Sequence, residues 1–316
     1  PSYRRPLTTE SCPALTTRAK WTYTAPMSHP AAPTPDQAAP LDLFKALEAA
    51  VTAAHAGAAI LQAYAHKRSE LVIDLKARND LVSQADREAE IAIIEVLRAR
   101  TPQFGIVAEE TGGTPSGPAS WYIDPLDGTT NFVHAIPHYA VSIALVANQD
   151  CGVAFDDAKC EPGPVVGVIY DPCREEMFTC VRGVGAWLNS HRIQCSRTGS
   201  LADALLATGF PYSDMSFTDN YLPMLRDAMH GTRGVRRNGA AALDLAWVAC
   251  GRFDGYWELR LKPWDIAAGT LLVREAGGLA FDPYERSPWP EHGDIVSGSP
   301  EIAKALHALI APNLKH

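Results

Sequence analysis

The feature that most constrains the fold is an apolar run that ends at two aspartates. It lies in the segment Trp121-Tyr-Ile-Asp-Pro-Leu-Asp-Gly-Thr-Thr-Asn131. Asp124 and Asp127 lie three residues apart around a proline turn, so both carboxylates can point to one place with the Leu126 carbonyl between them. Oxygen ligands without His or Cys suit Mg²⁺ better than zinc. The segment therefore predicts a buried strand that ends at a cation site.

Two further acidic segments accompany it. Ile106-Val-Ala-Glu-Glu110 is a strand running into paired glutamates, and Lys262-Pro-Trp-Asp265 precedes an apolar helix. Each segment alone has an ordinary explanation, as a turn, a solvated strand end or a helix cap. Gly128-Thr-Thr adds consecutive backbone N–H groups where a helix can begin, and such a start binds anions. The combination predicts metal ligands and phosphate donors side by side.

The first forty residues differ from the rest of the chain in composition and in apolar periodicity. Residues 1–40 are rich in Pro, Thr and Ala and show no period of a helix or a strand, so we expect a disordered tail. Met27 is a plausible start, and residues 1–26 are then an added or misassigned segment. A targeting peptide is the alternative, but no continuous apolar core follows the Arg4-Arg5 pair.

From residue 41 onward the pattern predicts a layered α/β or α+β catalytic domain over 41–312. The half 41–190 should hold two helices, Asp42–His66 and Ser83–Arg100, and an antiparallel sheet. The half 191–312 alternates strands and helices, and the stretch 148–164 is expected to be a long loop. Strands are expected at 104–108, 120–123, 138–147, 165–170, 176–181, 186–189, 205–209, 255–258, 279–282 and 295–298, and later helices at 219–229, 240–250, 265–275 and 300–310.

Composition excludes several classes of protein. A formal net charge of −8 argues against binding nucleic acid by overall charge, and a mean hydropathy of −0.09 argues against several membrane spans. The most apolar stretch, Ala49–Ala65, is mostly alanine and is expected to be a packed helix, not a span. Seven cysteines without a C-x-x-C motif favour free thiols in a reducing cytoplasm.

The motifs A-E-E at 108–110, W-Y-I-D-P-L-D-G-T-T-N-F-V-H at 121–134 and P-W-D-I-A-A-G…E-A-G-G at 263–278 resemble those of the inositol monophosphatase family. Members are lithium-sensitive, magnesium-dependent phosphomonoesterases, and R-R-N-G-A-A-A-L-D-L-A at 236–246 is similar to the bacterial branch. The resemblance implies a layered α-β-α-β-α sandwich of the inositol monophosphatase and fructose-1,6-bisphosphatase type. It also implies a homodimer.

Carried over by position, the resemblance implies two principal Mg²⁺ sites. The first falls on Glu109, Asp124 and the carbonyl of Leu126, and the second on Asp124, Asp127 and Asp265. A weaker third ion would lie at Glu109, and Li⁺ is the expected inhibitor. The chemistry agrees, because four carboxylates in one cleft raise one another's pKa unless cations lie between them.

The resemblance also assigns catalytic and substrate roles. A threonine held by an aspartate activates water in the family, and these residues match Thr129 and Asp86. The family's Gly-Thr-Ala loop reads Gly239-Ala240-Ala241 here, which lacks the hydroxyl but leaves the N–H of Ala241 available. The implied substrate contacts are Glu109, Leu126, Asp127, Gly128, Thr129, Gly239, Ala241, Glu258 and Asp265.

These assignments predict hydrolysis of a small phosphorylated polyol, with myo-inositol 1-phosphate first. Similar proteins hydrolyse sugar bisphosphates, adenosine 3′,5′-bisphosphate or histidinol phosphate, so those substrates stay open. An alternative is a regulatory protein that acts with the transcription and ribosomal RNA machinery. Arg226, Arg233, Arg236 and Arg237 could then form a basic patch, although a solvated face explains them as simply.

Overall fold

The computed structural model describes residues 41–67, 73–77, 80–148, 162–210 and 215–314. Of those within 73–82 it describes the backbone alone. Residues 40–316 form one unit. The tail predicted at 1–40 and most of the loop predicted at 148–164 lie outside the described residues. Residues 163 and 164 are not part of that loop, because they begin a strand.

Two alanine-rich helices form the first layer of the unit. Helix α1 (Leu43–Ala65) begins at Asp42, whose side chain accepts a hydrogen bond from the N–H of Lys45 at 3.0 Å. Helix α2 (Gln84–Arg100) packs along it, and small residues allow the close approach. By length and composition alone α1 could cross a membrane, but its alanine face is buried against α2 and a sheet. The prediction of a packed helix is confirmed.

The second layer is a seven-stranded sheet in the order β3-β4-β5-β6-β7-β8-β9. All neighbouring pairs are antiparallel except β3 and β4, which are parallel, so the prediction of an antiparallel sheet is wrong at this edge. Its strands are β3 (Gly105–Ala108), β4 (Ala119–Asp127), β5 (Ala140–Ala147), β6 (Gly163–Asp171), β7 (Glu176–Val181), β8 (Gly185–Leu188) and β9 (His191–Arg192).

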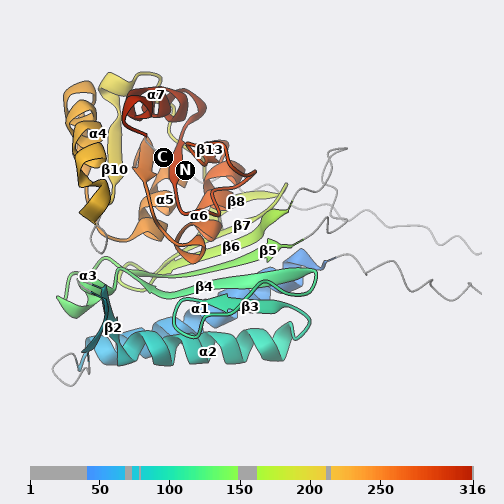
Figure 1. The fold of residues 1–316 in the computed structure, drawn as a ribbon. Helices are drawn as coiled ribbons and strands as arrows, with labels where there is room; N and C mark the ends of the chain where they lie inside the picture. The colour runs from blue at the N-terminus through green and yellow to red at the C-terminus, as the bar shows by residue number, and fades with distance from the viewer. Residues whose placement is uncertain (1–40, 68–72, 78–79, 149–161, 211–214, 315–316) are drawn as a thin grey trace, which may run out of the picture. The chain divides into compact units, whose positions relative to one another are not determined.

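Helices α5 (Ala241–Ala249) and α6 (Pro263–Glu275) separate this sheet from a second one (Figure 1). The second sheet has five strands in the order β11-β10-β12-β14-β13. Its other face is covered by α4 (Thr218–Gly231) and α7 (Pro300–Ile310). Its strands are β10 (Leu205–Thr208), β11 (Gly234–Arg236), β12 (Gly255–Glu258), β13 (Leu279–Phe281) and β14 (Ile295–Gly298).

Strand β12 illustrates how the layers are held, because its successive side chains point to opposite faces. Tyr256 lies in the apolar core shared with α5 and α6, whereas Trp257 lies in the core shared with α4 and α7. The predicted five-layer α-β-α-β-α sandwich is therefore confirmed. The short hairpin of β1 (Ile73–Ala77) and β2 (Asp80–Ser83) was not predicted. Helix α3 (Thr129–Val133) begins directly after Gly128, where a helix start was expected.

Candidate active site

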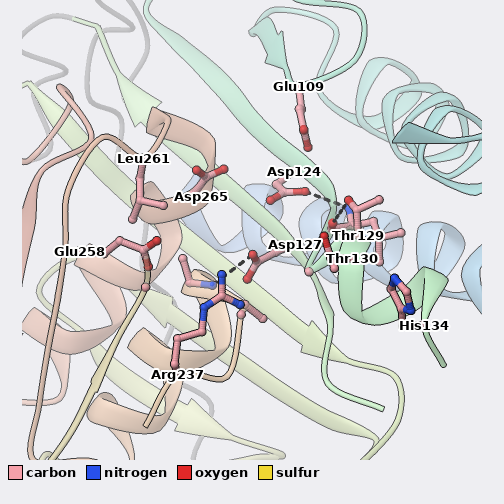
Figure 2. Close-up of a pocket in the computed structure, with 16 residues that line it drawn as sticks. Glu109, Asp124, Asp127, Thr129, Thr130, His134, Arg237, Glu258, Leu261 and Asp265 are labelled. Carbon is pink, nitrogen blue, oxygen red and sulfur yellow. Dashed lines mark hydrogen bonds between the residues drawn. The ribbon is translucent and has the colours of Figure 1, made fainter. Parts of the chain in front are cut away.

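A cavity of about 500 Å³ opens where β3, β4, α3, α5, α6 and β12 meet (Figure 2). Every site residue predicted from the sequence lines it except Asp86, which lies behind Thr129. The fold thus brings together acidic segments that are far apart in the sequence. The lining residues are Glu109, Asp124, Leu126, Asp127, Gly128, Thr129, Thr130, His134, Gly209, Arg237, Gly239, Ala240, Ala241, Glu258, Leu261 and Asp265.

The end of β4 carries two of the carboxylates. Asp124 pairs with Ser142 of β5 and Asp127 pairs with Ala140, so β4 has one residue more than its partner across this stretch. Such a bulge breaks the alternation of faces and re-aims side chains. The N–H of Leu126 donates to Asp124 Oδ1 at 2.9 Å, which fixes the turn and orients that carboxylate.

Asp127 is held by the first turn of α5. The N–H groups of Ala241 and Ala242 donate to its two carboxylate oxygens at 3.1 and 2.7 Å. The expectation that the N–H of Ala241 is free for substrate is therefore wrong in this arrangement, because that N–H anchors Asp127. Burial raises the pKa of Asp127 to about 7, although these backbone hydrogen bonds oppose the shift.

Asp86 and Thr129 meet as predicted. Asp86 is the third residue of α2, and its Oδ2 accepts the N–H of Ser83 at 2.8 Å, which closes the first turn. Its Oδ1 lies 3.0 Å from Thr129 Oγ1, and the Leu126 carbonyl oxygen lies 3.1 Å from the same hydroxyl. Burial raises the pKa of Asp86 above its usual value, against the hydrogen bonds from Ser83 and Thr129.

Glu109 follows directly after β3 and enters the cavity from the α2 side. Its N–H donates to the carbonyl of Ile123 on β4 at 3.1 Å. The next two N–H groups, of Glu110 and Thr111, donate to the buried carboxylate of Glu90, both at 2.7 Å. Glu90 therefore holds the turn that presents Glu109, and no sequence motif had indicated it.

Asp265 is the third residue of α6 and comes from the opposite side of the cavity. Its Oδ2 accepts the N–H of Lys262 at 2.8 Å. Burial, and then the charge of Glu109, raise its pKa well above the usual value. Burial, Glu109, Asp127 and Asp265 together raise the pKa of Asp124 in the same way. The four carboxylates act on one another electrostatically, although in the described part of the chain no three acidic, His or Cys side chains are already grouped tightly enough to hold an ion.

Glu258 at the end of β12 forms the far wall of the cavity, where it accepts a hydrogen bond from the hydroxyl of Tyr256. Burial raises its pKa to about 7. The carboxylate lies directly over Gly209, and a Cβ at that position would be 1.8 Å from Glu258 Oε1. A glycine at 209 is therefore required for the observed position of Glu258.

Several residues of the site were missed by sequence reasoning. Arg237 lines the cavity, so its interpretation as part of a basic patch or a solvated face is incomplete. Asn131 joins two loops, because its Nδ2 donates to the carbonyls of His138 and Asn238, each at 2.8 Å. Its position within the motif at 121–134 could have indicated that Asn131 belongs to the site. The remaining missed lining residues are His134, Gly209 and Leu261, whereas Thr130 and Ala240 belong to the predicted segments Gly128-Thr-Thr and Gly239-Ala240-Ala241.

Comparison with known proteins agrees with this architecture. The sequence model of the inositol monophosphatase family matches residues 42–316. The inositol-1-monophosphatase of Rhizobium meliloti is 44% identical over 244 residues, covering 76% of this chain and 86% of that protein. The putative Nus factor SuhB of Neisseria meningitidis serogroup B is also 44% identical, over 243 residues, covering 76% and 88%.

A solved structure extends the likeness to three dimensions. The inositol monophosphatase of Anabaena (Nostoc) sp. superposes with a TM-score of 0.73 at 37% identity, covering 86% of this chain and 97% of that one. The shared layers, the sequence likeness over most of the chain and the match to the family model lead to one conclusion. The chain belongs to the inositol monophosphatase family.

Proposed function

We propose that this protein is a Mg²⁺-dependent phosphomonoesterase that acts on a small phosphorylated polyol, with myo-inositol 1-phosphate as its first candidate substrate. Membership of the family supports hydrolysis of a phosphate ester. The observation that carries the proposal is a threonine hydroxyl hydrogen-bonded to a buried aspartate, beside carboxylates that raise one another's pKa. A structural role alone would give no reason to retain such costly groups.

The donor set fits Mg²⁺, because it consists of carboxylate and carbonyl oxygens. Glu109, Asp124 and the carbonyl of Leu126 would hold one ion, and Asp124, Asp127 and Asp265 the second. Ion binding would have to draw these side chains together. When bound, the ions supply positive charge to the phosphate oxygens and to the charge that develops during hydrolysis.

Thr129 and Asp86 would move the proton of the attacking water. If Thr129 Oγ1 donates its single hydrogen to Asp86 Oδ1, its lone pairs are free to accept a hydrogen bond from water. As the water oxygen forms its bond to phosphorus, the ester bond between phosphorus and the leaving-group oxygen breaks. The attacking water gives one proton to Thr129, the proton of Thr129 passes to Asp86, and the leaving oxygen takes a proton from solvent. The raised pKa of Asp86 favours this acceptance.

The remaining groups would bind and orient the substrate. Helix α3 begins at Thr129, so the N–H groups of its first turn have no partner within the helix and can donate to phosphate oxygens. Glu258 would accept a hydrogen bond from a hydroxyl of the leaving group. Gly239 also lines the cavity.

A phosphate-release assay tests the proposal. The purified full-length chain is incubated with a panel of phosphate monoesters, with and without Mg²⁺, and with Li⁺ as inhibitor. We expect Mg²⁺-dependent release that is fastest with the polyol phosphate and is inhibited by millimolar Li⁺. Absence of hydrolysis for every monoester, or equal rates in the presence of a chelator, would contradict the proposal.

A second role is suggested by the names of relatives, since proteins 42–44% identical to this chain are called Nus factor SuhB. We propose that this chain can also associate with transcription machinery. The test is affinity capture from native cells, in which RNA polymerase subunits should be recovered. Capture of none of them would contradict this role and leave the phosphatase proposal unaffected.

We further propose a cytoplasmic homodimer. The described cysteines, Cys173, Cys180, Cys195 and Cys250, are free thiols, as expected in a reducing compartment. Light scattering of the purified chain should give twice the monomer mass. A monomer at micromolar concentration would contradict the dimer.

A further inference from the structure

Arg237 brings a positive charge to the cavity wall, and the proposed phosphate chemistry assigns it no role. Among the described residues that line the cavity, it is the one arginine or lysine, and five lining residues are Asp or Glu. It lies beyond the end of β11, on the same wall as Glu258 and away from Glu109 (Figure 2). If the carboxylate cluster holds the phosphate as proposed above, this wall is left for the leaving group.

The guanidinium of Arg237 is held in place by its surroundings. Its carbon lies 5.5 Å from the centre of the Phe210 ring, which in turn contacts Tyr221 edge-on. On the other side, a Cβ on Gly239 would lie 2.5 Å from Arg237 Nη1. Gly239 also has φ 85°, a conformation that favours glycine, so residue 239 both permits this backbone and leaves room for the guanidinium.

The donors of Arg237 are left for a ligand. Among the described residues its guanidinium forms no hydrogen bond and no ion pair, and its contact with Phe210 uses only its face. A guanidinium has five N–H donors arranged as a planar fork. Its charge reaches the neighbouring carboxylates, because it acts to lower the pKa values of Glu258 and Asp244. An acceptor group in the cavity would therefore meet a positioned donor next to a positioned acceptor.

We propose, resting on the phosphatase function above, that Arg237 is a specificity residue that donates to a hydroxyl oxygen of the leaving group while Glu258 accepts from the neighbouring hydroxyl. A hydroxyl both donates and accepts, so two adjacent hydroxyls satisfy this pair of opposite partners. The substrate class is thus a phosphate monoester of a polyol with a vicinal diol. Simple alkyl and aryl phosphates lack the matching groups.

The same pair disfavours a second phosphate at this wall. A dianionic group that reached Arg237 would also face the carboxylates of Glu258 and Asp127. Like charges placed together repel one another, and such repulsion is a common means of rejecting wrong ligands. We therefore expect sugar bisphosphates to be poorer substrates than the monophosphate of a neutral polyol.

The neighbouring arginine provides a matched control. Arg236 and Arg237 are adjacent and both exposed, but Arg236 is not a lining residue of the cavity. The full-length Arg237→Gln, Arg237→Lys and Arg236→Gln variants are assayed at saturating Mg²⁺ with myo-inositol 1-phosphate, an aryl phosphate without hydroxyls, and fructose 1,6-bisphosphate. Inhibition by free myo-inositol is measured in parallel, because it reports polyol binding without chemistry.

We expect Arg237→Gln to raise KM for the polyol phosphate about tenfold more than KM for the aryl phosphate, the scale of one lost charged hydrogen bond. The inhibition constant of myo-inositol should rise with it. Arg237→Lys should recover part of the loss, and Arg236→Gln should change none of the constants more than about twofold.

Three results would overturn the inference. Equal rises in KM for polyol and aryl phosphates would place Arg237 outside the leaving-group contacts. A larger loss for the bisphosphate than for the polyol phosphate would mean that Arg237 binds a second anion. Effects of the Arg236 variant equal to those of Arg237→Gln would indicate general electrostatics. In each case hydrolysis of the aryl phosphate by the parent protein keeps the proposed function standing, whereas a parent inactive on every monoester removes both.

Discussion

Single carboxylates in this protein are placed where ionisation is expensive. Asp124 and Asp127 are among the buried residues, and burial is the largest cause of the raised pKa in each. Groups of one charge sharing a site oppose one another's ionisation, and bound cations reverse this effect. These side chains therefore lower the stability of the ion-free protein, and the proposed role as ion ligands would explain why they are kept there.

Asp265 allows the metal chemistry to be tested at one residue. Asp265→Asn keeps the size of the side chain and an oxygen to accept the N–H of Lys262, but removes one charge from the proposed second ion site. We expect kcat to fall by at least about a hundredfold, the scale of losing one preorganised electrostatic group. The thermal midpoint without metal should stay equal or rise. A Mg²⁺ titration of phosphate release, with melting in parallel, measures both, and near-normal kcat at saturating Mg²⁺ would remove Asp265 from the site.

The raised pKa of Asp127 predicts the sign of a pH effect. The native carboxyl titrates at about 7 and the unfolded one near 4, so between these values the native state binds the additional proton. The proton held by Asp127 therefore contributes to the free energy of unfolding below pH 4, and this contribution is lost as the pH rises through about 7. Urea unfolding is measured once with a chelator and once with saturating Mg²⁺, and the stabilisation by Mg²⁺ should be larger at pH 7.5 than at pH 5. An equal Mg²⁺ effect at both pH values would contradict this assignment.

Helices α2 and α6 each orient an aspartate of the candidate site through the same kind of hydrogen bond at the helix start. In α2 and in α6 the third residue is an aspartate whose Oδ2 turns back to the N–H of the capping residue, Ser83 or Lys262. In α2 the other oxygen then faces Thr129. The helix start thus fixes the rotamer of a carboxylate at the candidate site. Sequence alone allowed Asp265 to be an N-cap, whereas it occupies the third position of its helix.

Glu90 offers a test of how one element supports another. Its carboxylate is fully buried and accepts the N–H groups of Glu110 and Thr111, so Glu90→Gln would place an amide N–H₂ against one of these donors. We expect the free energy of unfolding to fall by about 1–3 kcal/mol, the cost of an unsatisfied buried donor. The exposed Glu95→Gln on the same helix should change it by less than about 0.5 kcal/mol. Urea unfolding measures both, and equal effects would show that the turn does not depend on Glu90.

Periodic elements could be predicted from the sequence, but contacts between distant elements could not. The helices and most strands follow from apolar patterns, and the acidic motifs contain the carboxylates at 109, 124, 127 and 265 that line the cavity. No local pattern shows that Glu90 supports the turn after Glu109, or that the N–H of Ala241 is used by Asp127. Arg237 resembled a solvated charge because its proposed role depends on Phe210 and Gly239, which only the fold places beside it.

At the scale of the whole unit, the site depends on both sheets at once. Glu109, Asp124 and Asp127 come from the seven-stranded sheet, whereas Glu258 comes from the five-stranded one, and α5 and α6 join them. The apolar core around α5 and α6 contains residues of both sheets. Loosening of that core would separate the proposed phosphate-binding side from the proposed leaving-group side. Activity should therefore be lost together with global structure and not before it.

The unit formed by residues 40–316 should also be sufficient for folding and catalysis. The composition of residues 1–40 cannot supply a packed apolar face, and the match to the family begins at residue 42. A chain that begins at Leu41 keeps Asp42, which caps α1 through the N–H of Lys45. We expect its thermal midpoint to stay within about 2 °C of the full chain, since a change of a few tenths of a kcal/mol shifts it by no more than that. The rate of phosphate release should be nearly unchanged.

A chain that begins at Leu43 is the informative comparison, because it lacks the cap and should lose about 1 kcal/mol of stability. A large loss of stability or activity already in the chain that begins at Leu41 would show that the removed segment contributes to the fold.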